Sequence, residues 1–88
     1  MTRQYELTLV FSPQLSPEKR EEIQKKLLKD MKVTIEDLGA LALAYPIAKQ
    51  TRGHFVRAQI QVEPEGIVKM KETLKITEGI LRYLIIKS

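Results

Sequence analysis

The chain has 88 residues, a length that predicts one domain spanning residues 1–88, with a small core and no room for a deep enzymatic cleft. Hydrophobic residues make up 43% and charged residues 30%, as in ordinary globular proteins, and a net charge of +4 mildly favours a polyanionic partner. The absence of cysteine excludes disulfides and zinc knuckles, and there is no apolar run of membrane-spanning length and no signal-peptide core, so we expect a cytoplasmic protein.

The first half of the chain predicts a strand and a helix. The strand runs from Gln4 to Phe11, where apolar and polar residues alternate as in a strand with one buried face. The helix has Ser16 as its N-cap and Pro17 in its first position. Its apolar residues recur at helical spacing and predict a buried stripe that ends near Met31. The stripe consists of Ile23, Leu27, Leu28 and Met31.

The middle of the chain predicts a long hairpin. One strand, or two strands joined by a bulge near Gly39, is expected from Val33 to Tyr45. Pro46 cannot donate to a ladder, so it belongs at a strand end or a sheet edge. The next strand starts at Gly53. One of its faces is apolar, and the other (Phe55, Arg57, Gln59 and Gln61) resembles a sheet face that no helix covers.

The last part of the chain predicts a second helix and a final strand. The helix begins at Pro64 and buries Ile67, Met70 and Leu74. The nearly apolar run from Ile80 to Ile86 is predicted to be a central strand. The element order is β-α-β-β-α-β, which predicts an α+β, ferredoxin-like fold: a four-stranded antiparallel sheet with two helices on one face. The other face stays open and is the natural place for a partner.

A basic, acid-free stretch stands out in this plan. No Asp or Glu occurs from Leu38 through Val62, so Lys49, Arg52 and Arg57 are expected to lack local neutralisation and to suit RNA phosphates. In the usual strand order of this fold the first strand lies between the third and the fourth. Arg57 and Arg82 should therefore flank it. The plainer interpretation is a set of scattered surface arginines.

The residues that catalysis needs are missing. The chain has one His and no nucleophile with a recognisable base partner, no glycine-rich phosphate loop and no metal-ligand cluster, so we expect no enzyme, no metal and no cofactor. An acylphosphatase-like enzyme shares the element order, but it uses an Asn and this chain has none. Two alternatives stay open. One is an RNA recognition motif, whose third-strand signature is only partly matched by residues 52–58. The other is a regulatory module that dimerises and binds a metabolite.

Three motifs together resemble one known family. The central run is Leu43-Ala44-Tyr45-Pro46-Ile47-Ala48-Lys49, followed by Gly53-His54-Phe55. The opening is Arg3-Gln4-Tyr5-Glu6, and the closing run extends from Ile80 to Lys87. All three are similar to motifs of the S-six family of bacterial small-subunit ribosomal proteins, and the resemblance covers essentially the whole chain.

This resemblance implies a ferredoxin-like fold, no catalysis, and binding to the central domain of small-subunit rRNA. The implied protein partner is small-subunit ribosomal protein eighteen, in a heterodimer, with no membrane and no small-molecule substrate. By position, the residues expected to face the RNA are Arg3, Lys49, Arg52, Arg82 and Lys87. Arg57 joins them on the charge argument alone. The residues expected at the protein partner are Leu41, Leu43, Tyr45, Pro46 and Ile47.

Two departures from the family pattern qualify these expectations. Many relatives carry Arg or Lys where this chain has Leu41 and Ala42, which suggests a more apolar partner surface here. Relatives often have a tail beyond the last strand, whereas this sequence stops at Ser88. Contacts made by such a tail are expected to be lost or made by other groups.

Overall fold

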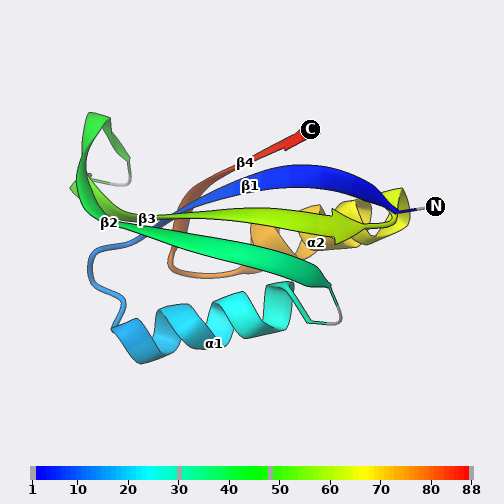
Figure 1. Cartoon of the computed structure of the whole chain (residues 1–88). Coiled ribbons are helices and arrows are strands. Elements are labelled where there is room, and N and C mark those ends of the chain that lie inside the picture. Colours follow the sequence, from blue (N-terminus) through cyan, green and yellow to red (C-terminus); the bar gives the residue numbers. More distant parts are fainter. Residues whose placement is uncertain (1, 30, 48, 88) are drawn as a thin grey trace.

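The structure, a computed structural model, describes residues 2–29, 31–47 and 49–87. The elements in chain order are β1 (Arg3–Phe11), α1 (Pro17–Leu27), β2 (Lys32–Ile47), β3 (Gln50–Val62), α2 (Pro64–Ile76) and β4 (Ile80–Lys87). The strands form one antiparallel sheet in the order β2-β3-β1-β4, and both helices lie on the same face of it (Figure 1). The predicted ferredoxin-like fold is confirmed.

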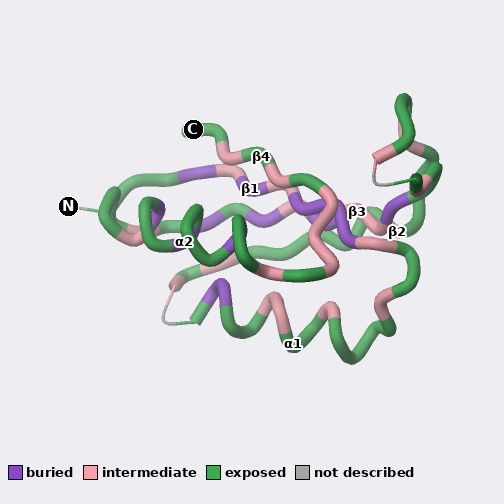
Figure 2. Tube along the Cα trace, turned by 180° about the vertical axis from the view of Figure 1, so that it is seen from behind, coloured by how far each residue is buried: buried purple, intermediate pink, exposed green. Residues whose placement is uncertain are grey.

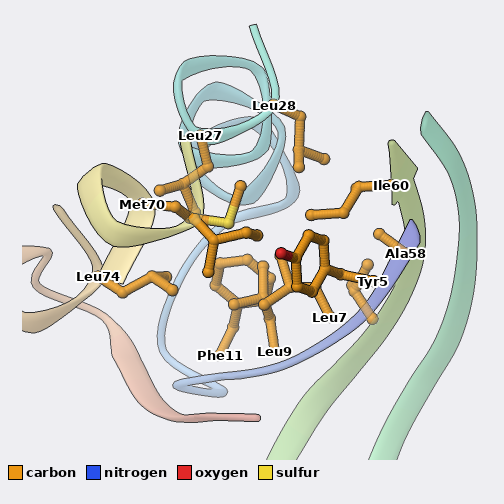
Figure 3. Close-up of a cluster of buried hydrophobic side chains, with 12 residues drawn as sticks. Tyr5, Leu7, Leu9, Phe11, Leu27, Leu28, Ala58, Ile60, Met70 and Leu74 are labelled. Carbon is orange, nitrogen blue, oxygen red and sulfur yellow. The ribbon is translucent and has the colours of Figure 1, made fainter. Parts of the chain in front are cut away.

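The core lies between the sheet and the two helices. β1 pairs on both sides, with β3 and with β4, and every second side chain along it turns toward the helices. Leu7, Leu9 and Phe11 are at most 1% exposed, and they point toward Met70 and Leu74 of α2 (Figure 3). Figure 2 colours the chain by burial, and in the sheet the buried residues lie mainly on β1 and β3. The predicted inward faces of β1, β3 and α2 are confirmed.

Both helices begin with a proline in the first turn, as predicted. Ser16 caps α1, because its hydroxyl accepts a hydrogen bond from the backbone N–H of Lys19 at 3.2 Å. α1 ends at Leu27 rather than near Met31, which packs against the core from the connection to β2. The apolar stripe therefore runs on past the last helical turn. No helix in the described part of the chain is long and apolar enough to cross a membrane.

β2 contains the predicted bulge. Its register against β3 shifts between Asp37 and Gly39, and Gly39 has a φ of +80°, which glycine adopts without strain. A carboxylate oxygen of Asp37 accepts the backbone N–H of Gly39 at 2.8 Å. The same oxygen lies 2.7 Å from Nε2 of His54 on β3. The contact between Asp37 and His54 therefore holds the bent part of β2 against β3.

Two further predictions are wrong, one about where β3 begins and one about the place of β4 in the sheet. β3 begins at Gln50, not at Gly53, because the hairpin ladder continues beyond the sheet to the turn, where Lys49 has a φ of +66°. β4 is an edge strand rather than a central one, since it pairs only with β1. Its apolar sequence is explained differently: Tyr83 and Ile85 pack against the core, while Leu84 and Ile86 lie on the open face, about half exposed.

Gly53 is required by a close contact. A Cβ atom at this position would lie 2.5 Å from Cγ1 of Val10, and a valine side chain has little rotamer freedom with which to move aside. We predict that Gly53→Ala lowers the free energy of unfolding by about 1–3 kcal/mol in urea denaturation. In a Val10→Ala background, Gly53→Ala should lower the free energy of unfolding by clearly less. Equal losses in both backgrounds would contradict the contact.

The Asp37 carboxylate gives the fold a pH dependence. The hydrogen bond from His54, helped by the Gly39 N–H, lowers the pKa of Asp37 below its ordinary value. A lowered pKa stabilises the fold above the pKa of the unfolded chain, and this contribution is lost as the pH falls through the folded value. The Asp37 side chain is 58% exposed, so we expect less than about 1 kcal/mol.

The test is Asp37→Asn, which keeps an acceptor for Gly39 but removes the charge. At neutral pH the variant should be less stable than the wild type. The difference should shrink as the pH falls below about 4 and through the lowered pKa of the folded state, where the wild-type carboxyl is finally protonated in both states. Urea denaturation at a series of pH values measures it, and a difference that does not change with pH would refute the assignment.

Candidate nucleic-acid and protein interface

The end of the β2–β3 hairpin rises on the side of the sheet away from the helices (Figure 1). Its ladder is regular as far as the Ala42–Arg52 pair and resumes at Ile47 and Gln50. Between these points β2 departs from the ladder, and Leu43 bends back until its Cδ2 lies 3.6 Å from the position a Cβ of Gly53 would occupy. The hairpin end therefore curls over the open face of the sheet.

This curl encloses a small apolar hollow of about 170 Å³. Val10, Phe55 and Arg82 form its sheet side, and they come from β1, β3 and β4. The hairpin side is formed by Ala42, Leu43, Ala44, Tyr45 and Ile47. Among the described residues of this lining, Arg82 is the only charged one, so the hollow suits an apolar side chain bordered by a polar or anionic group.

The five residues predicted at a protein partner gather at this hairpin end. Leu43, Tyr45 and Ile47 line the hollow, whereas Leu41 and Pro46 do not. Tyr45 is 78% exposed, although aromatic side chains are usually far more buried. Leu41 is 44% exposed. An exposed apolar cluster of this kind marks an interaction surface more often than a solvated one.

The predicted RNA residues fall into two groups. Lys49 and Arg52 are exposed in the hairpin, and Arg82 lies opposite Val10 in the neighbouring strand pair, so these three share one end of the molecule. Arg3 and Lys87 lie at the other end, opposite Val62 and Tyr5 respectively. Seven positions of extended strand separate Arg3 from Val10, or about 23 Å. A single contiguous basic patch is therefore not formed.

The expectation that Arg57 lacks acidic neighbours is wrong. Its Nη2 lies 2.9 Å from Oε2 of Glu36 on β2, and its Nε lies 3.5 Å from Oε1 of Glu6 on β1. The hydrogen bond and the charge of Glu36, with a smaller effect of Glu6, raise the pKa of Arg57 above its ordinary value. Arg57 is therefore neutralised across the sheet although its stretch of sequence is free of acids, because cross-strand neighbours come from distant positions.

The flanking arrangement itself is confirmed. Arg57 pairs with Thr8 and Arg82 pairs with Val10, so the two arginines lie on either side of β1 on the open face. They differ in their surroundings. Arg57 is held by two carboxylates, whereas Arg82 makes no ion pair with any residue that the structure describes.

Two exposed apolar residues were missed by the sequence interpretation. Leu84 and Ile86 of β4 lie opposite Thr8 and Glu6, on the open face. Val10 of β1 and Phe55 of β3 add to this apolar area, which Arg82 borders, while Arg57, Gln59 and Glu36 make the face polar over the rest of β3 and over β2. The signal of Leu84 and Ile86 in the sequence was hidden, because both faces of β4 carry apolar side chains.

The structure also bears on the alternatives. Val56, at one of the stacking positions that an RNA recognition motif would use, is 1% exposed and faces the helices. At the other stacking position, Nε2 of His54 lies 2.7 Å from Oδ1 of Asp37, so the ring is already engaged. Among residues 2–29, 31–47 and 49–87, no three His, Cys, Asp or Glu side chains come close enough to hold a metal ion.

Comparisons with known proteins agree with this geometry. The family model for ribosomal protein S6 matches residues 4–87. The small ribosomal subunit protein bS6 of Caldanaerobacter subterraneus subsp. tengcongensis is 35% identical, over 98% of this chain and 97% of that protein. The bS6 of Solidesulfovibrio magneticus is 30% identical, over 97% and 89% of the two chains.

A solved structure supports the fold. The crystal structure of 30S ribosomal protein S6 from Thermotoga maritima superposes with a TM-score of 0.89, covering 100% of this chain and 89% of that one at 21% identity. At 21% identity this similarity supports the fold only. Membership of the family is shown by the family model and by the similar bS6 proteins. On these findings the chain belongs to the ribosomal protein S6 family.

Proposed function

We propose that this protein binds the central domain of small-subunit rRNA as a heterodimer with small-subunit ribosomal protein eighteen. Its family membership makes it a non-enzymatic, structural protein of the small subunit of the cytoplasmic ribosome. The proposal concerns its contacts there. One observation carries it: the hairpin end joins an exposed apolar cluster to cations without ion pairs among the described residues.

The apolar part of this end suits a protein partner. Tyr45 and Leu41 project into solvent, and the hollow beside Tyr45 has the size for one inserted side chain. Leu84 and Ile86 extend the apolar surface along β4. Interfaces are stabilised chiefly by a few buried aromatic and apolar anchors of this kind, surrounded by a polar rim.

The basic part suits RNA phosphates. Lys49 sits at the turn and Arg52 on the strand that leaves it, both exposed, and Arg82 lies beside the hollow. Phosphate contacts of Lys and Arg provide affinity and position the protein, whereas they carry little sequence information. Arg3 and Lys87 would make a second, separate contact about 23 Å away along β1. Arg57 contributes least, because Glu36 and Glu6 already neutralise it.

Charge reversal tests the RNA contact. Lys49→Glu with Arg52→Glu should abolish binding to a central-domain rRNA fragment at moderate salt, because two phosphate contacts become repulsive. The milder double change to Ala should reduce the slope of log affinity against log salt by roughly 2. Circular dichroism should show an unchanged fold, since both side chains are exposed.

The matched control reverses two lysines on the helix side, Lys69 and Lys71 of α2, which are also exposed. It changes the net charge equally but leaves the hairpin intact. Equal loss of RNA affinity in both double variants would show that only net charge matters. That result would contradict a contact at the hairpin.

Truncation of the exposed aromatic tests the protein contact. Tyr45→Ala should weaken binding of small-subunit ribosomal protein eighteen by roughly 2 kcal/mol, about 30-fold, as expected for an aromatic anchor at an interface. Isothermal titration calorimetry measures the affinity. Ile76→Ala on α2, where the side chain is 83% exposed, is the control and should leave binding unchanged. Wild-type affinity in Tyr45→Ala would remove the hairpin from the interface.

A further inference from the structure

The end of β2 far from the hairpin carries a second surface that can bind a partner. β2 is an edge strand, so one side of its backbone is unpaired. A groove of about 490 Å³ lies between its first half and α1. Leu28, Val33 and Ile35 give the groove an apolar floor, and Ile35 is 45% exposed. Glu21, Gln24 and Lys25 of α1 form its polar side.

We propose that this edge binds a second copy of the chain. Residues 32–36 of the two copies would pair antiparallel about a two-fold axis at Thr34, so that the two sheets continue into one another. The two α1 helices would then lie next to each other on the same face. This surface is distinct from the hairpin end, and the proposal does not depend on RNA binding or on a heterodimer.

The sequence of the strand is self-complementary in this register. With Thr34 opposite itself, Val33 lies opposite Ile35 of the second copy. Lys32 then lies opposite Glu36, on the open face, and each of these contacts occurs twice. The neighbouring register, centred on Ile35, is worse because it places Val33 opposite Asp37. A register centred between two residues would bring opposite faces of the strands together.

The helix side is complementary in the same way. Glu21 and Lys25 are one turn apart on α1 and both border the groove. Neither forms an ion pair with another described residue, whereas Lys19 pairs with Glu22 at 3.8 Å. Because a two-fold rotation reverses the direction of the second α1, Glu21 and Lys25 run in opposite orders on the two helices, and the proposal pairs Lys25 of each copy with Glu21 of the other. Because these charges are complementary to themselves under a two-fold rotation, they favour a second copy of the chain as the partner.

Part of the usual protection of an edge strand is present in β2, but it does not block the proposed segment. Pro46 lies near the far end of the strand, Lys32 faces Glu36 of the second copy, and Glu36 and Asp37 are engaged by Arg57 and His54. The bulge at Gly39 lies outside the proposed pairing segment. Five strand residues and two helical turns make a small interface, so a weak, reversible dimer is expected.

Sedimentation equilibrium of the full chain tests the proposal. Between about 1 µM and 1 mM, the average mass should rise from 10.2 kDa toward twice that value. Ile35→Lys should raise the dissociation constant at least tenfold. Val68→Lys on α2, another exposed apolar residue, should not change it. A constant 10.2 kDa mass, or equal weakening by both variants, would overturn the proposal.

Two further tests, a cross-link and a charge exchange, locate the axis. The chain has no cysteine, so Thr34→Cys introduces a single thiol where the two copies face each other. Mild oxidation should yield mostly disulfide-linked dimer, and Val68→Cys should yield little. Glu21→Lys should weaken the dimer, and adding Lys25→Glu should restore it by exchanging the two charges. A dimer without the Thr34→Cys cross-link, or without this rescue, would refute the edge assignment.

Discussion

The burial of β1 is the constraint on which the rest of the structure depends. Its inward side chains, Leu7, Leu9 and Phe11, are among the most completely buried in the core, and its backbone pairs on both sides. A shift of one residue would expose this whole set, so the registers of β3 and β4 against β1 are strongly determined. Those registers decide which side chains reach the open face. They place Phe55 and Arg82 on either side of Val10, and so create the floor of the hollow.

The β2–β3 hairpin extends from this sheet, and the position of its end depends on a few local features. The bulge at Gly39, fixed by the Asp37–His54 pair, bends β2. The missing side chain of Gly53 lets the hairpin lie close to Val10. Apolar and basic groups are therefore held together at one end of the molecule, while the first half of β2 and α1 remain available at another. An S6-family protein of this design can make its contacts without any catalytic group.

Much of this could be predicted from the sequence, because periodicity reports burial directly. The strand alternation of β1 and β3, the stripe of α2 and the irregularity at Gly39 all follow from spacing and residue type. Predictions failed where neighbours come from distant positions. Arg57 lies in an acid-free stretch, yet Glu36 and Glu6 face it across the sheet. β4 looked central because both its faces are apolar, whereas the strand order places it at an edge and the exposure of Leu84 and Ile86 shows that one face is open. The hollow could not be foreseen either, since it requires β1, β3, β4 and the hairpin to meet.

The central claim is that the hairpin end holds RNA and protein together. The most direct measurement is the affinity for a central-domain small-subunit rRNA fragment across a salt series, with and without small-subunit ribosomal protein eighteen. The account predicts tight binding only with the partner present, weakening steeply as salt rises, because phosphate contacts dominate and each protein supplies part of the basic surface. Binding that is independent of the partner, or insensitive to salt, would contradict it.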